Sequence, residues 1–167
     1  MRKFICKFAA DRAGVAATEF ALGTTLLFMA ILAGMDFGGY FMQRGQINEA
    51  VSAAAMQSFQ QRENVNFAGL QSYVRNLADS QTVTVTTSCN GAANSCTNLN
   101  RTCACLKTDG TFAATTCGTA CGGGATAGST AGYYLTIEAS DAFRKVLLPK
   151  GTMAGDRVSQ SVTVRLQ

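Results

Sequence analysis

The apolar residues of this chain gather in one block near its N-terminus. Residues 20–35 carry no charge, and the apolar segment extends over residues 15–42 when Glu19 and Asp36, near its two ends, are included. A membrane-spanning helix needs about 20 predominantly apolar residues, which only the longer segment supplies. The pattern therefore predicts a transmembrane helix over residues 15–42, with Tyr40 and Phe41 at the outer interface.

Beyond this segment, apolar positions recur every three or four residues, which is the spacing of one helix face. The pattern predicts an amphipathic stalk helix over residues 43–80, with a break near residues 60–66. Asn64 and Asn66 are the candidate caps for a second helical segment. The positions that follow the spacing are Ile47, Val51, Ala54 and Ser58 in the first part, and Phe67, Leu70, Val74 and Leu77 in the second.

The periodicity then changes to two, as in β-strands. Residues 82–87, 133–139 and 161–166 are three strand candidates, and antiparallel pairing is the simplest arrangement for strands this short. Residues 81–167 are thus expected to form a small antiparallel β domain, with residues 141–156 as a loop that packs back on the sheet. The predicted fold class is α+β.

A cysteine-rich insert, residues 89–132, separates the first two strand candidates. It is rich in Gly, Ala, Thr and Asn, with residues 118–132 as its flexible part, and it has too few large apolar residues to form a core. Six of the seven cysteines fall here, which indicates a disulfide framework in an oxidising compartment. Six cysteines allow 15 pairings, and the sequence selects none of them. The six are Cys89, Cys96, Cys103, Cys105, Cys117 and Cys121.

The charge is concentrated in a basic leader, residues 1–14, which supplies +3 of the net charge of +4. The positive-inside rule places this leader in the cytoplasm and the C-terminal part outside the membrane. Cys6 lies in the leader and is expected to stay reduced. The nearly neutral remainder has no basic stripe, so nucleic acid is not an expected partner.

Candidate chemistry is sparse. The chain has no histidine, which excludes Ser/His/Asp and Cys/His catalysis and leaves the cysteine spacing unlike that of zinc sites. The glycines at 122–124 lack the GK[ST] ending of a phosphate loop. Glu138, Asp141 and Asp156 show no diagnostic spacing and are expected on the solvated surface. We therefore predict no enzyme activity, no metal and no cofactor.

The junction between leader and helix carries the most informative motif, Arg12-Ala13-Gly14-Val15-Ala16-Ala17-Thr18-Glu19-Phe20. A basic leader ends in glycine, a glutamate is the fifth residue after it, and a long apolar helix follows. This pattern resembles the processing site of type IV pilin-like proteins, and its Ala-Gly-Val-Ala-Ala-x-Glu-Phe-Ala form is similar to the TadE-like family of Tad (Flp) tight-adherence pilus systems. The similarity extends through about Met56, and resumes more weakly at residues 134–140, 147–149 and 159–166.

The resemblance implies a minor pilin or pseudopilin in the bacterial cytoplasmic membrane. A prepilin peptidase would cut between Gly14 and Val15, and Glu19 and Phe20 would serve peptidase recognition and assembly. Implied partners are the peptidase, the major Flp-type pilin, a sister pseudopilin, the inner-membrane Tad platform and membrane lipid. The implied function is assembly of a Tad-type pilus, and so adherence.

Physical reasoning leaves alternatives open beside this. An ionised Glu19 in the apolar layer costs up to about 2.5–3.5 kcal/mol at the bilayer centre, so it is normally kept for a partner, such as a new amine at Val15. The chain is alternatively an uncleaved signal anchor that tethers a ligand-binding domain, or a secretory precursor cut near residues 50–56. Gly34 and Gly38 form a GxxxG pair that would permit close helix packing or merely soften the helix.

Overall fold

The computed structural model describes residues 12–143 and 157–167. The basic leader up to residue 11, with Cys6, lies outside the described residues, as do residues 147–149 and Asp156. The elements are α2 (Arg12–Gln60), α3 (Phe67–Leu77), β1 (Thr84–Cys89), β2 (Ala92–Ala93), β3 (Cys103–Leu106), β4 (Phe112–Thr115), β5 (Tyr134–Ala142) and β6 (Arg157–Arg165).

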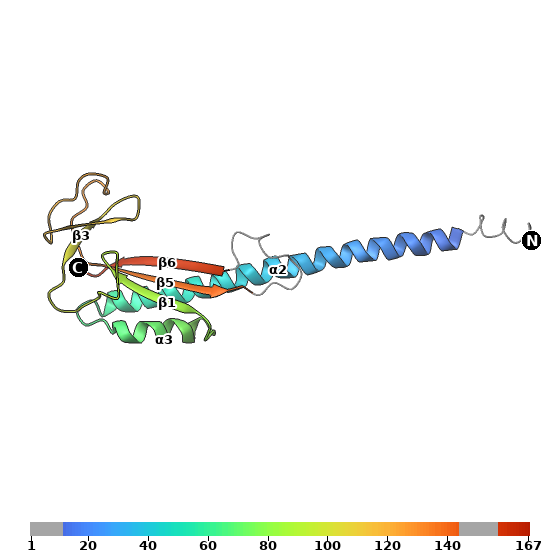
Figure 1. Ribbon diagram of the computed structural model, residues 1–167, viewed down its shortest axis with the longest axis horizontal. Coiled ribbons are helices and arrows are strands. Elements are labelled where there is room, and N and C mark those ends of the chain that lie inside the picture. The colour runs from blue at the N-terminus through green and yellow to red at the C-terminus, as the bar shows by residue number, and fades with distance from the viewer. Residues whose placement is uncertain (1–11, 144–156) are drawn as a thin grey trace, which may run out of the picture.

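A single helix, α2, sets the shape of the molecule. It runs for 49 residues without interruption, so the apolar segment and the first part of the predicted stalk are one element. Its N-terminal half projects alone, and its C-terminal half lies against the sheet and α3 (Figure 1). We call the sheet, α3 and the C-terminal half of α2 the head.

The break in the helical region falls between Gln60 and Phe67. Asn66 is the N-cap of α3, and its side chain accepts a hydrogen bond from Gly69 N at 3.0 Å. A side-chain oxygen in this position satisfies one of the amide groups that the first turn of a helix leaves unpaired. The cap allows α3 to start afresh and to lie beside α2 (Figure 1).

The head contains a four-stranded sheet in the order β2-β1-β5-β6. All neighbouring strands are antiparallel, with Ile137 at the centre of β5 opposite Thr87 of β1 and Val162 of β6. The predicted α+β class with an antiparallel sheet is therefore confirmed. The strands extend beyond their candidates, and β5 continues through Ala142, so the first residues assigned to a loop are part of the sheet.

One core joins the sheet to the two helices. The inward positions of β1, β5 and β6 alternate with outward Thr, Ser and Glu residues, because successive side chains of a strand point to opposite faces. The predicted helical stripe is buried at Ile47, Val51, Ala54 and Ser58 on α2 and at Leu70 and Val74 on α3, while Leu77 is exposed. The buried apolar residues of this stripe share one core cluster with Val85, Leu135, Ile137, Ala139 and Val158 from the sheet.

The cysteine-rich insert forms a separate lobe at the end of the head opposite the N-terminus (Figure 1). It contains β3 and β4, which pair as an antiparallel hairpin, and isolated bridges such as Ala120 with Thr130. The sequence pattern did not predict this hairpin. Its buried cluster is small, consisting of Cys103, Cys105 and Ala131.

Candidate functional site

The predicted processing and assembly residues all lie near the N-terminal end of α2. Gly14, Val15, Glu19 and Phe20 are exposed, with 57% of Val15 and 76% of Phe20 accessible. A Cβ atom added at Gly14 would meet no atom within 4 Å. No part of the described chain covers this segment, so it is accessible to another protein or to lipid.

The rest of the projecting half is apolar on every side. Among the described residues, one helix, residues 14–60, is long and apolar enough to cross a membrane. Its hydroxyls at Thr18 and Thr25 donate to the carbonyl oxygens of Val15 and Ala21, both at 2.8 Å. Such internal bonds suit a bilayer, where no water is available to satisfy polar groups. Large side chains exposed here include Leu22, Leu26, Leu27, Phe28, Ile31 and Met35.

The GxxxG pair also lies on the projecting half. A Cβ atom at Gly34 or at Gly38 would meet nothing within 4 Å, so no described residue packs against either glycine. Gly39 differs, because a Cβ there would come within 3.7 Å of the Phe143 ring. The described chain thus leaves room for another helix at Gly34 and Gly38, and covers Gly39 itself.

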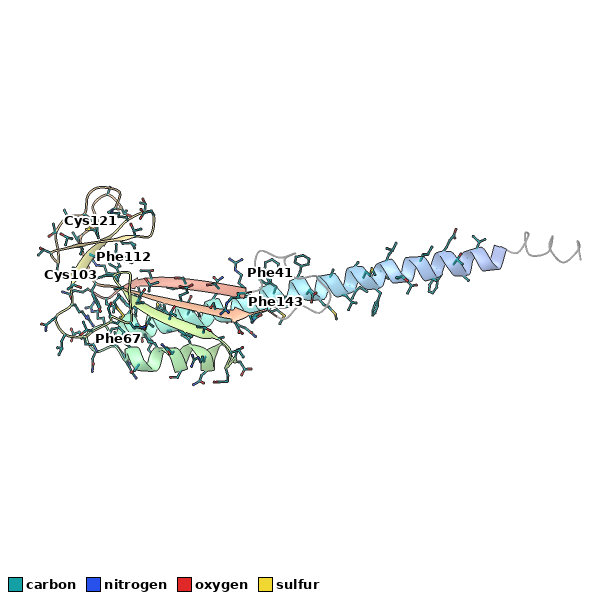
Figure 2. The ribbon with its side chains drawn as sticks, viewed as in Figure 1. Phe41, Phe67, Cys103, Phe112, Cys121 and Phe143 are labelled. Carbon is teal, nitrogen blue, oxygen red and sulfur yellow. A yellow bond between two sulfur atoms is a disulfide. The ribbon has the colours of Figure 1, made fainter. Side chains whose placement is uncertain are left out.

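Asp36 and an aromatic cluster mark the transition from projecting helix to head. Asp36 is only 2% exposed, although the large residues around it are open. The Tyr40 ring packs edge to face on Phe143, with centroids 5.5 Å apart, and on Phe41 at 5.8 Å. Phe41 and Phe143 lie where the head begins (Figure 2). Phe41 remains 62% exposed, as an interfacial aromatic would be.

Asp141 is buried, and the prediction that it lies on the solvated surface is wrong. Only 4% of its surface is exposed. Its carboxylate accepts hydrogen bonds from Gln43 Nε2 at 2.9 Å, Ser80 Oγ at 3.1 Å and Thr82 Oγ1 at 2.8 Å. The backbone N–H of Ala142 donates to the same carboxylate. Buried charges need such partners. Asp141 thereby ties β5 to α2 and to the start of the sheet, whereas Glu138 on the same strand is exposed.

The six clustered cysteines form three disulfides. Cys89 pairs with Cys96, Cys103 with Cys117, and Cys105 with Cys121. The last two bridges hold the distal lobe, where Cys103 and Cys121 are visible (Figure 2). The first closes a short loop at the end of β1. Crosslinks of this kind stabilise a segment that lacks a sufficient apolar core.

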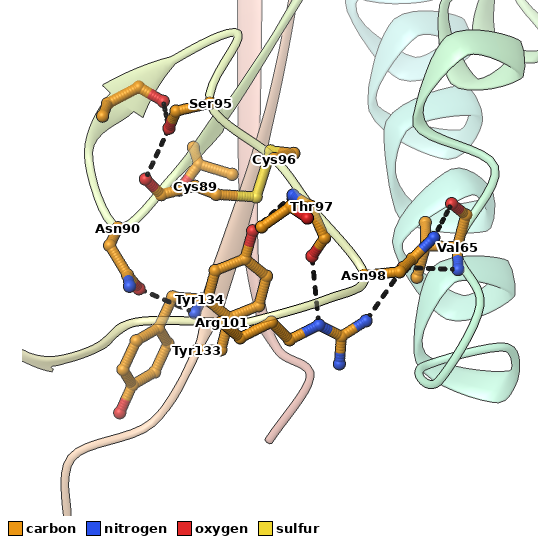
Figure 3. Close-up of a disulfide and its surroundings, with 12 residues drawn as sticks. Val65, Cys89, Asn90, Ser95, Cys96, Thr97, Asn98, Arg101, Tyr133 and Tyr134 are labelled. Carbon is orange, nitrogen blue, oxygen red and sulfur yellow. Dashed lines mark hydrogen bonds between the residues drawn. A yellow bond between two sulfur atoms is a disulfide. The ribbon is translucent and has the colours of Figure 1, made fainter. Parts of the chain in front are cut away.

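The loop after Cys96 clamps the lobe to the head (Figure 3). The Asn98 side chain pairs with the backbone of Val65, accepting from its N–H at 3.0 Å and donating to its C=O at 3.1 Å. The Tyr133 hydroxyl accepts from Thr97 N at 2.9 Å. Arg101 lies over the Tyr133 ring, 5.1 Å from its centroid, and donates to the C=O of Arg62 at 2.5 Å. The turn between α2 and α3 is therefore fixed by the insert.

One titratable group in the lobe has a shifted pKa. Asp109 lies in the turn between β3 and β4, and it accepts hydrogen bonds from the Thr111 hydroxyl and the Thr111 N–H. These bonds favour the ionised carboxylate and hold the pKa of Asp109 below its usual value. The charge of Asp109 therefore helps to form the hairpin turn.

Sequence reasoning missed several residues that organise the head. The Asn90-Gly91 pair turns β1 into β2 with positive φ at both positions, 50° and 81°, and this dipeptide between two strands was a readable hairpin signal. Gln43 and Asn98 gave no such signal, because their partners lie 98 and 33 residues away along the chain.

Comparison with protein families gives one match, to the family model described as TadE-like protein, over residues 14–56. Comparison with curated proteins gives no match, and neither does comparison with solved structures. The family match begins at Gly14 and covers most of α2, while the sheet and the cysteine-rich lobe lie beyond it.

The match therefore falls on the same helix that carries the Gly14-to-Phe20 motif, the exposed apolar half and the open glycine pair. By its length and composition this helix is able to cross a membrane once. Over residues 14–56 this chain is similar to the TadE-like family, which suggests a pilin-like protein associated with a Tad pilus system.

Proposed function

We propose that this chain is a minor pilin or pseudopilin precursor, that a prepilin peptidase cuts it between Gly14 and Val15, and that the product serves assembly of a Tad-type pilus and adherence. The observation that carries the proposal is the TadE-like match beginning at Gly14 on a helix half that the described chain leaves uncovered. The proposed role is structural and not catalytic.

The proposed mechanism depends on one new charge. Cutting after Gly14 would create a positively charged amine at Val15, four positions before Glu19. Within the apolar layer the Glu19 carboxylate would be stabilised by such an amine, either its own or that of a neighbouring subunit. Phe20 and the open faces at Gly34 and Gly38 would then pack against the neighbouring helix.

The proposed topology follows from the leader. Its basic residues would stay in the cytoplasm, so the head would lie on the outer side of the bacterial cytoplasmic membrane. The disulfides are consistent with this side, which is the oxidising one. The proposed partners are the prepilin peptidase, the major Flp-type pilin, a sister pseudopilin and the inner-membrane Tad platform.

Two glycine variants test whether the chain is cut after Gly14. We expect Gly14→Leu to block processing and to abolish surface pili, because the peptidase would need a small residue at the membrane border. Gly23→Leu is the matched control, since a Cβ at either glycine meets nothing within 4 Å and both lie on exposed α2. The proposal fails if Gly14→Leu is processed normally, or if both variants behave alike.

A glutamate comparison tests assembly. Glu19→Ala should still be inserted and cut, but it should assemble poorly because the partner of the Val15 amine is lost. Glu49→Ala is the control, an exposed glutamate on the same helix beyond the apolar segment. Normal surface pili with Glu19→Ala, counted by electron microscopy, would mean that Glu19 is only an interfacial charge.

A further inference from the structure

A groove lies between α2 and β6, which run side by side in the head (Figure 1). Its volume is about 390 Å³, which is within the range of small-molecule pockets. Phe41, Arg44, Gly45 and Asn48 line it from α2, and Gln160 lines it from β6. A Cβ atom at Gly45 would meet nothing within 4 Å, so the lack of a side chain there helps to keep the groove open.

Arg44 gives the groove its charge. Among the described residues that line the groove, Arg44 alone is charged, and it makes no hydrogen bond or ion pair with any of the described chain. Other arginines of the head donate hydrogen bonds within the chain, namely Arg75, Arg101, Arg157 and Arg165. A guanidinium presents its N–H donors in a planar fork that matches the oxygens of a phosphate or a carboxylate. The groove therefore favours an anion.

The position of Arg44 along α2 indicates which anion it would meet. At about 1.5 Å per residue, the helix from Phe20 to Phe41 is about 32 Å long, close to the hydrocarbon thickness of about 30 Å. Arg44 lies about 5 Å farther along the axis than Phe41, within a headgroup layer that is about 5–8 Å thick on each side. If α2 spans the membrane, Arg44 is thus level with the phosphodiester groups of the lipids.

The lining residues follow the order of the parts of a phospholipid. Going away from the membrane, Phe41 is followed by Arg44 and then by Asn48, at intervals of three and four residues that place them on one helix face. Phe41 is 62% exposed and would lie against the start of an acyl chain, with the phosphate at Arg44. Asn48 and Gln160 would then face the terminal part of the headgroup.

The two amides favour a headgroup with hydroxyls over one with an amine. Gln160 Nε2 donates to the Ser159 C=O at 2.6 Å, while its Oε1 and the Asn48 amide make no hydrogen bond in the described structure. Side-chain amides both donate and accept, as hydroxyls do. None of the described lining residues is acidic, so an ammonium headgroup would lose hydration without gaining a counter-charge.

We propose that the groove between α2 and β6 binds the headgroup of an anionic phospholipid with free hydroxyls, such as phosphatidylglycerol. The proposal requires α2 to span the membrane, and it is independent of a cut after Gly14. An acidic peptide would also pair with Arg44, but it would have to displace lipid from a layer that phosphate already occupies. The peptide is therefore the competing occupant in the test.

The test titrates lipids onto the full-length chain in dodecyl maltoside micelles and measures binding by native mass spectrometry. The probes are phosphatidylglycerol, phosphatidylethanolamine and phosphatidylcholine with identical acyl chains. Glycerophosphoglycerol, the headgroup without chains, and a Gly-Asp-Gly-Glu peptide are competitors. We expect phosphatidylglycerol to bind at least about fivefold more tightly than the other two lipids, as one arginine near the membrane surface supplies. Neither competitor should displace it.

Two variants locate the site. Arg44→Gln should weaken phosphatidylglycerol binding about fivefold and abolish the preference over phosphatidylcholine. Arg62→Gln is the matched control, an exposed arginine beyond the far end of α2, and it should bind like the unaltered chain. Gly45→Leu fills the groove without changing its charge, so it should weaken binding while the melting temperature does not fall, since a Cβ there meets no atom.

Three results would overturn the proposal. The first is equal binding of the three lipids, and the second is displacement of phosphatidylglycerol by the peptide or by glycerophosphoglycerol. The third is a variant, either Arg44→Gln or Gly45→Leu, that binds phosphatidylglycerol as tightly as Arg62→Gln does. Cleavage after Gly14 is read from the N-terminus of the mature chain and does not depend on these results, so the lipid site and the proposed function fail separately.

Discussion

The two halves of α2 differ in how far their apolar side chains are exposed. In the N-terminal half the large apolar side chains are open, with Phe20 76% and Leu26 69% exposed. In the C-terminal half Val51 and Ala54 are fully buried by the sheet and α3. The first half is apolar all round and the second on one stripe only, which distinguishes a helix surrounded by lipid from one covered by protein on one side.

One substitution on each half of α2 tests this difference in exposure, and it should give the largest effect. Val51→Asp places a carboxylate in the core without a partner and should destabilise the head by more than about 3 kcal/mol. Leu26→Asp should leave the head folded and reduce membrane insertion, because an acidic residue near the bilayer centre costs about 2.5–3.5 kcal/mol. Limited proteolysis and carbonate extraction measure the two effects. If both variants unfolded the head equally, the distinction between an exposed N-terminal half and a buried C-terminal half of α2 would be contradicted.

The second prediction separates the head core from the cysteine-rich lobe. Replacing Cys103 and Cys117 with serine opens a bridge that spans 14 residues, and should cost the lobe about 3 kcal/mol. The amides of β3 and β4 should then exchange faster, while those of α2 and β5 stay protected. Hydrogen exchange measured by mass spectrometry checks this.

The bridge between Cys89 and Cys96 is the matched comparison. Its loop leads directly to Asn98, which bonds the turn between α2 and α3. Replacing this pair with serine should also loosen residues 61–66. If both double variants affect the same segments, the lobe is not an independent unit.

The third prediction concerns the tie between β5 and α2. Asp141→Ala leaves the donors Gln43 Nε2, Ser80 Oγ and Thr82 Oγ1 without their acceptor, and should lower the free energy of unfolding by about 1–3 kcal/mol. Glu138→Ala, at an exposed site on the same strand, should change it by no more than about 0.5 kcal/mol. Denaturant titration compares the two, and similar values would remove the special role of Asp141.

The smallest expected effect is a pH dependence within the lobe. Because the pKa of Asp109 is lowered in the folded chain, its contribution is present above the pKa of the unfolded state. That contribution is lost as the pH falls through the lower, folded value. The protection factor of the Thr111 amide, which is the exchange rate corrected for its intrinsic pH dependence, should therefore fall in acid, and it should no longer change with pH in Asp109→Ala. An unchanged pH profile in that variant would exclude Asp109 as the cause.

Much of the fold could be predicted from local patterns. The spacing of Ile47, Val51 and Ala54 marked the buried face of α2, and the alternation around Val85, Ile137 and Val162 marked the sheet. Both signals are periodic, and they result from one side of an element facing the core.

The remaining features depend on contacts that no local pattern contains. In the lobe the buried residues are cysteines and alanines, so β3 and β4 lack the apolar alternation of ordinary strands. The pairing of six thiols is set by the folded chain. The burial of Asp141 depends on donors at positions 43, 80 and 82.

The central claim is that the projecting half of α2 is made as a precursor and matures by losing its leader. Intact mass and N-terminal sequencing of the protein from cells with and without the prepilin peptidase test it most directly. The account predicts a chain of 153 residues starting at Val15 when the peptidase is present, since 14 of the 167 residues are removed, and the full-length chain when it is absent. Full-length protein under both conditions would contradict it.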